Sequence, residues 1–371
     1  MTKLDIAHLR LHNQLITQQT FEKPCDVVQW LGAVQAQDYM AAKWALGLRL
    51  QGTTDNTIEH AFTNGEILRT HVMRPTWHFV SPADIRWLLA LTAPHVHATN
   101  AYYYRQFALD DAIFMQSNAA LVKALQGGKQ FTRPEIISVL EQASITSNDP
   151  LRFGLIIMHA ELDGIICSGA RRGKQFTYAL LDERVPQTRT LARDEALAEL
   201  ARRYFTSHGP ATVQDFVWWS GLPAADAKAG LSMVKSQLLH EIVDDQTYWF
   251  SPSTSPIRDV AQLAHLLPNF DEYTVGYADR SAVFDSAHAS KLDARMGLLG
   301  YIMVLDGQIV GIWKRTIQKN AVTITANLFA PLNEAETRAF TIAANRYGAF
   351  LDLPVNSTFQ MEAQGRDVAH S

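Results

Sequence analysis

Two glutamines separated by a single residue, Gln35 and Gln37, form the most informative group of polar side chains in the sequence. Residues i and i+2 point to the same side of an extended segment, whereas they diverge on a helix. Two neutral amides that converge on one target can hold and orient a water molecule or a sugar. They cannot act as a strong base, so the pair predicts chemistry that depends on positioning.

The residues around the pair predict a break between two helices. Apolar spacing indicates one amphipathic helix over 26–34 and another over 39–50. Asp38 precedes the second helix and is a candidate for its N-cap. We therefore expect Gln35 and Gln37 to lie on an extended connection where both side chains reach one small target.

Three carboxylates compete with the amides for the role of a general base, and each has a simpler explanation. A cap accounts for Asp38, and Asp271 with Glu272 follows Pro268-Asn269, a typical turn sequence. We prefer these structural interpretations for all three. Asp271 and Glu272 remain the alternative, since a tail domain could bring them to the glutamines.

Other chemistry receives little support from the sequence. His95 and His97 stand near Pro94 without a third ligand at a usual spacing, so we interpret them as surface or packing residues and expect no metal. There is no phosphate-binding loop, dinucleotide fingerprint or nucleophile elbow, and we expect no cofactor. No lysine is marked as a nucleophile, which favours chemistry without DNA strand cleavage.

Composition indicates an ordinary globular protein with room for two to four domains. The chain has 371 residues, of which 47% are hydrophobic and 19% charged, and its formal net charge is -4. A nucleic acid would therefore have to meet a local basic patch. Two isolated cysteines, Cys25 and Cys167, suggest a reducing compartment. With no apolar leader or spanning segment, we expect a cytoplasmic protein.

One unit of organisation recurs along the chain, and residues 191–250 contain its clearest copy. A helix with an apolar stripe precedes a short helix over 212–220, a tight turn at Gly221, a third helix over 224–234 and a hairpin. Two helices joined by a short turn with glycine form a helix-turn-helix, and the trailing hairpin makes the unit a winged helix.

A second copy spans about 117–181, and the first copy, which is looser, is followed by a helix over 82–92. After Leu263 the character changes, because residues 301–305, 309–313 and 322–327 indicate strands and residues 334–347 a helix. In the second copy, Thr132 and Glu135 predict a capping box. The expected fold class is α+β, with tandem winged helix-turn-helix units followed by a β-rich C-terminal domain. The boundaries we expect are 1–116, 117–188, 189–258 and 259–371.

Basic residues gather at two predicted strand ends. Arg171, Arg172 and Lys174 surround Gly173 at the tip of the second unit's hairpin, where they could approach a phosphate backbone or simply lie in solvent. Lys314 and Arg315 end a strand of the C-terminal domain, and there the solvated interpretation is the better one. Three winged helices in one chain favour a DNA partner for the first group.

Several spaced motifs together resemble one family, the AlkZ-like winged-helix DNA glycosylases. The resemblance covers nearly the whole chain and rests on Gln35-Ala36-Gln37, Arg74-Pro75-Thr76-Trp77-His78, Arg172-Gly173-Lys174-Gln175, Asp182-Glu183-Arg184-Val185-Pro186, Gly209-Pro210-Ala211-Thr212, Leu267-Pro268-Asn269-Phe270-Asp271-Glu272-Tyr273 and Gly311-Ile312-Trp313-Lys314-Arg315.

The resemblance implies both a reaction and the residues that perform it. In this family the Gln-apolar-Gln motif is catalytic, which assigns that role to Gln35 and Gln37. A sister branch, the YcaQ-like proteins, has aspartate at the second amide, so Gln37 places this chain nearer the AlkZ branch. Members excise bulky N7-alkylated purines, and some unhook interstrand crosslinks, so the resemblance implies glycosylase chemistry without defining the lesion.

The sequence thus predicts a monomeric, monofunctional DNA glycosylase associated with the nucleoid, acting on double-stranded DNA with alkylated bases. The alternatives are a non-catalytic winged-helix regulator and a protein-interaction scaffold. Side chains of Gln35 and Gln37 that share a concave, basic-rimmed channel would favour catalysis, whereas burial or divergence would favour the regulator. The expected DNA contacts are Arg74, His78, Arg171, Arg172, Lys174, Lys314 and Arg315.

Overall fold

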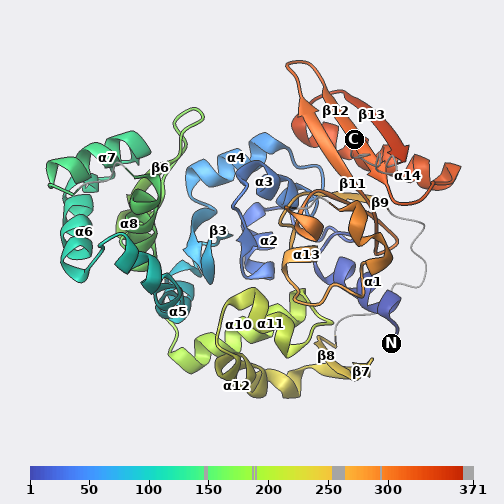
Figure 1. The fold of residues 1–371 in the computed structure, drawn as a ribbon, viewed down its shortest axis with the longest axis horizontal. Coiled ribbons are helices and arrows are strands. Elements are labelled where there is room, and N and C mark those ends of the chain that lie inside the picture. Colours follow the sequence, from blue (N-terminus) through green and yellow to red (C-terminus); the bar gives the residue numbers. More distant parts are fainter. Residues whose placement is uncertain (146–148, 186–187, 189, 253–263, 293–294, 362–371) are drawn as a thin grey trace, which may run out of the picture.

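The computed structural model describes residues 1–145, 149–185, 188, 190–252, 264–292 and 295–361, and its helices and strands are mixed along the chain (Figure 1). The first region contains α1 (Lys3–Asn13), α2 (Pro24–Leu31), β1 (Val34–Gln35), α3 (Tyr39–Gly47), α4 (Asp55–Asn64), β2 (Leu68–Val72), β3 (Arg74–Val80) and α5 (Ile85–Gln106). Its three strands form one antiparallel sheet in the order β1-β3-β2.

The second region continues with helices that enclose a small sheet. It contains α6 (Asp111–Leu125), β4 (Phe131–Thr132), α7 (Arg133–Gln142), α8 (Pro150–Leu162), β5 (Ile166–Ser168), β6 (Thr177–Leu180) and α9 (Leu181–Arg184). The predicted capping box is confirmed, because the Thr132 N–H group donates to Glu135 Oε2 over 2.6 Å. The predicted hairpin is also present, with β5 and β6 antiparallel.

The third region has the predicted succession of three helices and a hairpin. It contains α10 (Arg193–Ser207), α11 (Val213–Ser220), α12 (Ala224–Val234), the 3₁₀ turn η1 (Lys235–Gln237), β7 (Leu239–Val243) and β8 (Gln246–Phe250). Gly221 adopts φ +68° at the end of α11, where a Cβ atom would lie 2.3 Å from the carbonyl oxygen of Met73. This close approach seats the turn between α11 and α12 on the β2–β3 hairpin.

The C-terminal region is built on a five-stranded sheet in the order β13-β12-β11-β10-β9. It contains β9 (Ala264–Leu267), α13 (Glu272–Val275), η2 (Ser286–Lys291), η3 (Gly297–Leu299), β10 (Ile302–Leu305), β11 (Gln308–Ile317), β12 (Val322–Leu328), α14 (Glu334–Leu351) and β13 (Val355–Met361). Strand β13 pairs parallel to β12 after α14 crosses between them. The sequence analysis predicted β10, β11, β12 and α14 and missed β9 and β13.

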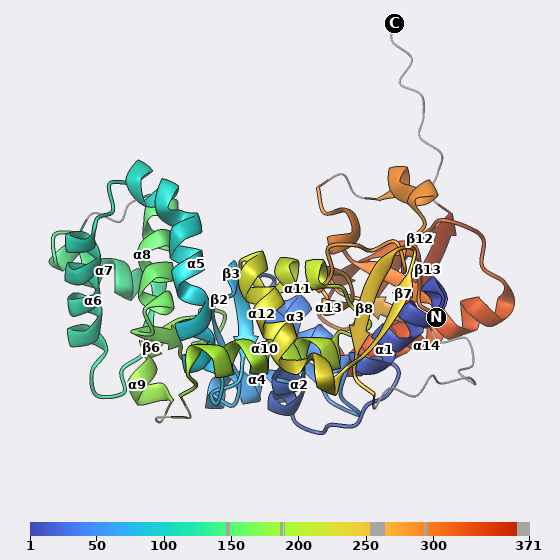
Figure 2. The ribbon, with the colours of Figure 1, turned by 90° about the horizontal axis from the view of Figure 1, so that it is seen from below.

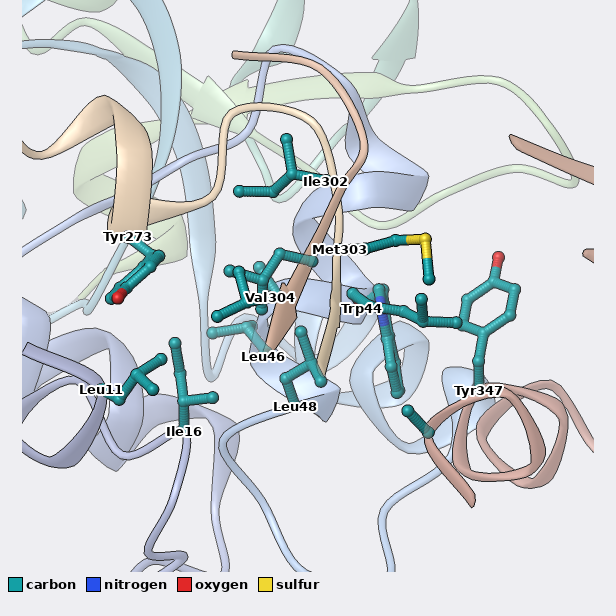
Figure 3. Close-up of a cluster of buried hydrophobic side chains, with 14 of the residues drawn as sticks. Leu11, Ile16, Trp44, Leu46, Leu48, Tyr273, Ile302, Met303, Val304 and Tyr347 are labelled. Atoms are coloured by element: carbon teal, nitrogen blue, oxygen red, sulfur yellow. The ribbon is translucent and has the colours of Figure 1, made fainter. Parts of the chain in front are cut away.

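The C-terminal sheet shares its hydrophobic core with the first region, which differs from the separate domain that we expected. One cluster of buried side chains joins Leu46 and Leu48 with Met303, Val304 and residues of α14. Figure 3 shows Trp44 of α3 between Met303 of β10 and Tyr347 of α14. Apolar alternation identifies a buried face, but it does not say against which segment that face packs.

Helix α5 is longer than predicted. The sequence indicated a helix from Pro82 to Thr92, but α5 continues through Pro94 to Gln106. A proline inside a helix removes one backbone hydrogen bond, and here Ala93 and Val96 on either side of it pack against Leu162 of α8. His95 and His97 therefore lie within a helix and not at its end. Helices α5 and α8 lie side by side (Figure 1 and Figure 2).

No helix among the described residues combines the length and apolar character needed to cross a bilayer. Cys167 is buried and Cys25 partly so, and both are free thiols. Burial raises the pKa of the Cys25 thiol to about 11 and that of Cys167 to about 12. Protonated thiols of this kind are inert as nucleophiles.

Candidate active site

The two glutamines lie at the end of β1, on the edge of the first sheet. Gln35 pairs with His78 of β3, and the N–H group of Ala36 donates to the carbonyl oxygen of Trp77 over 2.7 Å. Helix α3 begins only after Asp38, whose side chain caps it. The predicted extended break between two helices is therefore confirmed, as is the cap.

Both amide oxygens accept a hydrogen bond from a neighbouring group. Gln35 Oε1 accepts from Arg74 Nη2 over 2.8 Å, and Gln37 Oε1 accepts from the backbone N–H of Trp77 over 3.3 Å. Because these partners can only donate, they define which end of each amide is oxygen. Neither amide nitrogen has a hydrogen bond within the described part of the chain. Two NH₂ groups and one further lone pair on each oxygen remain for a ligand.

The two amides differ in accessibility. The side chain of Gln37 is exposed, whereas Gln35 is only 6% exposed. By the criterion set above, the burial of Gln35 counts toward the regulator, and the exposure of Gln37 alone does not establish a channel that the two side chains share. What holds Gln35 in place is a set of buried polar groups.

A buried carboxylate, Glu272 at the start of α13, supports the backbone of Gln35. Glu272 Oε1 accepts from the Gln35 N–H group over 3.0 Å, while Oε2 accepts from Trp219 Nε1 over 2.9 Å and lies 3.3 Å from His208 Nε2. Burial acts to raise the pKa of Glu272, but these hydrogen bonds and the charge of Arg74 bring it below its ordinary value. The carboxylate is therefore ionised and fully engaged.

The interpretation of Asp271 as a turn residue is confirmed, whereas a turn role alone does not account for the side-chain contacts of Glu272. Asp271 caps α13 by accepting from the Tyr273 N–H group over 2.9 Å. Its two oxygens also pair with the buried guanidinium of Arg49 over 2.8 and 2.9 Å. Asp271 is thus a structural residue. The side chain of Glu272 instead contacts the backbone of Gln35 in the first sheet.

Arg74, which we expected to contact DNA, orients the side chain of Gln35. Its Nη2 group donates to Gln35 Oε1, and its Nη1 group lies 3.5 Å from the carbonyl oxygen of Trp218. Burial lowers the pKa of Arg74, and the nearby charge of Glu272 acts in the opposite direction. An arginine remains a cation under these conditions. Its contact with DNA stays a prediction.

His78, the second expected DNA contact on this strand, is buried. Only 1% of its surface is exposed, and its Nδ1 atom lies 3.0 Å from the carbonyl oxygen of Thr76. Burial and the charge of Arg74 lower the pKa of His78 to about 3. A side chain in this position does not reach a DNA surface, so the structural interpretation of His78 is the better one.

Because the protein contains buried neutral histidines, we expect its free energy of unfolding to fall in acid. His78 and His265 both have their pKa lowered to about 3 by burial, compared with 6.5 in the unfolded chain. Between these values the unfolded chain binds protons that the native protein does not, so stability falls as pH falls. Each histidine contributes a slope of about 1.4 kcal/mol per pH unit in that window. Urea unfolding from about pH 7 to about pH 5 measures this slope.

In the same experiment, His78→Asn should lower the slope by about 1.4 kcal/mol per pH unit. The matched control is His60→Asn, because His60 is exposed. Equal slopes for His78→Asn and the unmodified protein would contradict the assignment of a neutral buried His78.

The three cations of the β5–β6 hairpin are engaged to different degrees. Arg171 lies over the rings of Tyr39 and Phe176 and 3.5 Å from Glu59, so it packs against the first region. Arg172 forms an exposed ion pair over 2.7 Å with a glutamate of α7. Lys174 is exposed and has no ion pair within the described ranges. Figure 1 shows this hairpin projecting beyond the helices around it.

The two cations of β11 also differ. Lys314 is exposed, whereas Arg315 is partly buried and lies over the rings of Tyr301 and Tyr347, at 4.8 and 5.7 Å. Burial raises the pKa of Tyr301 to about 12, with Arg315 acting in the opposite direction. Arg315 therefore packs against aromatic side chains, and only Lys314 is free to reach a partner.

Comparisons with known proteins identify the family of the chain. The model of the family described as "DNA glycosylase AlkZ-like" matches residues 28–350. An interstrand DNA cross-link repair glycosylase from Streptomyces sahachiroi is 24% identical over 336 residues, covering 85% of this chain and 88% of that protein.

A solved structure shows the same fold. The Streptomyces sahachiroi DNA glycosylase AlkZ superimposes with a TM-score of 0.80 at 20% identity, covering 96% of this chain and 100% of the other. The family model matches most of the sequence, and the solved structure has the same fold, so the two comparisons lead to one assignment. The chain belongs to the AlkZ-like family of DNA glycosylases.

Proposed function

We propose that this protein hydrolyses the N-glycosidic bond of N7-alkylated purines in double-stranded DNA, with Gln35 and Gln37 positioning the attacking water and the deoxyribose. The observation that carries the proposal is the anchoring of both amides. Arg74 holds one oxygen, the Trp77 N–H group holds the other, and both NH₂ groups remain available. Such a pre-positioned pair spends little entropy when it binds a reactant.

The proposed reaction needs no strong acid or base. Water attacks the anomeric carbon as the bond between that carbon and N9 breaks. The bonding electron pair passes to the base, where it cancels the positive charge that N7-alkylation introduced, and a proton from the water goes to solvent. A general base adds about two to four powers of ten to a rate, and a cationic leaving group makes that contribution less necessary.

The buried carboxylate supports this choice of mechanism. Glu272 is 0% exposed, and both of its oxygens already accept hydrogen bonds, so it cannot also hold the attacking water. Its negative charge offsets that of Arg74 beside the amides. We infer that Glu272 is a positioning residue that acts through Gln35, and that the amides alone touch the substrate.

A panel of three duplexes tests the proposal, carrying N7-methylguanine, a bulkier N7 adduct and an interstrand crosslink at guanine N7. We expect release of the modified base from at least the first two, with an abasic site and an intact strand as products. The Streptomyces sahachiroi relative is an interstrand DNA cross-link repair glycosylase, so the crosslink is the third test substrate. Recovery of all three duplexes unchanged would favour a non-catalytic regulator.

The β5–β6 hairpin carries a prediction about DNA affinity. Lys174→Gln removes a hairpin cation that has no ion pair among the described residues, so the slope of log K against log salt should become less steep by about one. Fluorescence anisotropy at several salt concentrations measures this slope. The control is Lys23→Gln, another exposed lysine. An unchanged slope would place the hairpin outside the DNA interface.

The other cations rank below Lys174 as proposed DNA contacts. Arg172 would have to exchange its glutamate for a phosphate, and Arg171 would have to leave two aromatic rings. Lys314 is available as it stands. We propose Lys174 and Lys314 as the phosphate contacts of a monomer working in the nucleoid, with Lys174 on the winged-helix unit at 117–188 and Lys314 on the C-terminal domain at 259–371.

A further inference from the structure

Two histidines and an aspartate meet between α5 and α8, away from the glutamine pair. His97 Nε2 lies 3.2 Å from Asp163 Oδ1, and His159 Nδ1 lies 3.1 Å from Asp163 Oδ2. One possible ligand atom from each residue falls within 4.8 Å of the others. The sequence analysis set His97 aside because no third ligand stood nearby, and α8 supplies both missing ligands.

The position of each residue follows from its helix. His159 lies in the last turn of α8 and Asp163, four residues later, is its C-cap, so the two side chains lie on one face of the helix. His97 reaches that face because α5 continues past Pro94. The two imidazole rings lie next to each other, 4.6 Å apart between centroids, and each faces a different oxygen of the same carboxylate.

One nitrogen in this group has no satisfactory partner. His159 Nδ1 is shielded from solvent and makes no hydrogen bond of acceptable geometry in the described part of the chain, although Asp163 Oδ2 is close. A buried polar atom without a hydrogen bond is costly. Its cost is removed if the lone pair of that nitrogen binds a cation.

Neighbouring side chains hold the three residues as outer partners hold metal ligands. The hydroxyl of Tyr104 lies 3.0 Å from His97 Nδ1, so Nε2 is the nitrogen that faces Asp163. Asn118 Nδ2 donates to Asp163 Oδ2 over 3.1 Å, and the ring of Phe114 stacks on His159 at 3.6 Å. Such contacts select the imidazole nitrogen that binds a metal and fix the ring.

Access to the group also suits a cation. His97 and Asp163 line a pocket of about 390 Å³ beside Pro94, which leaves room for a water ligand.

We propose that His97, His159 and Asp163 bind one Zn²⁺ ion, with water from the pocket as the fourth ligand. Two imidazoles and one carboxylate form a donor set that zinc takes in tetrahedral sites with an open position. The ion links α5 to α8 and so stabilises the region that carries the β5–β6 hairpin. The proposal does not depend on the glycosylase mechanism.

Equilibrium dialysis of the untagged full-length chain against zinc chloride, with metal measured by mass spectrometry, tests the site. We expect one zinc ion per chain and a rise in melting temperature with zinc concentration. His159→Gln and Asp163→Asn should each weaken zinc binding by at least about 100-fold. Tyr104→Phe should weaken it by about tenfold, because the Tyr104 hydroxyl contacts the imidazole of His97 and not the ion.

The matched control is His95→Gln, two residues from His97 on the same helix but 3.4 Å from Asp226 and outside the group. It should bind zinc as the unmodified protein does. Cobalt in place of zinc should give the strong visible absorption of a four-coordinate site, which needs no variant that might misfold. Substoichiometric zinc, equal affinities in all variants, or the weak absorption of six-coordinate cobalt would each overturn the proposal.

Discussion

Replacing both Gln35 and Gln37 with alanine should lower the rate of N7-methylguanine excision by at least about 1,000-fold while DNA affinity stays within about twofold. Loss of one group that is positioned for the transition state costs about 100- to 1,000-fold, and residues that act as a unit give less than additive losses. DNA affinity should persist because the proposed phosphate contacts lie on β11 and the β5–β6 hairpin.

Single-turnover excision with enzyme in excess measures the chemical step, and anisotropy on the same duplex measures binding. The control is Gln51→Ala, because Gln51 is an exposed glutamine without a hydrogen bond in the described chain. Excision by the double variant within tenfold of the unmodified rate would mean that the amides do not position the reactants.

The second large effect is expected from Glu272→Gln, which keeps the shape of the side chain and removes its charge. The new NH₂ group must face either the Gln35 N–H or the Trp219 Nε1–H group, both of which donate. One buried donor is then unsatisfied, at a cost of about 1–3 kcal/mol. Because the backbone anchor of Gln35 is then either lost or reduced to a neutral amide oxygen, which accepts more weakly than a carboxylate, excision should also slow by at least tenfold.

Urea unfolding measures the first effect and single-turnover excision the second. Trp219→Phe is a companion variant that removes one donor while the carboxylate keeps its contact with Gln35. It should lose stability but retain most of the excision rate. Glu141→Gln, at an exposed glutamate, controls for the chemistry of the substitution. A Glu272→Gln protein with an unchanged excision rate would show that the support of Gln35 does not depend on this carboxylate.

Local signals in the sequence were enough to place the glutamine pair. A cap, a turn and the spacing of apolar residues all act within a few positions, so Asp38 and the extended segment before α3 were predictable. The same holds for Thr132 with Glu135, and for the helices and hairpin of residues 193–250.

Contacts between distant segments were beyond such signals. Glu272 contacts Gln35, which lies 237 positions earlier in the sequence. In the sequence alone, the turn at Pro268-Asn269 explained Asp271 and Glu272 equally well. His97 had no visible third ligand because α8 follows some sixty positions later. Proline suggested a helix end at Pro94, but packing against Leu162 outweighed one lost hydrogen bond.

The hydrophobic core that strands β10 and β11 share with α3 has a consequence for synthesis on the ribosome. A nascent chain that has released only its first hundred residues carries Gln35 and Gln37 but lacks the strands that shield Leu46 and Leu48. Segments that cannot bury such surface are prone to aggregate. Truncation before β10 should therefore yield an insoluble product rather than a slow enzyme, and catalysis should arise only when the last third of the polypeptide has emerged.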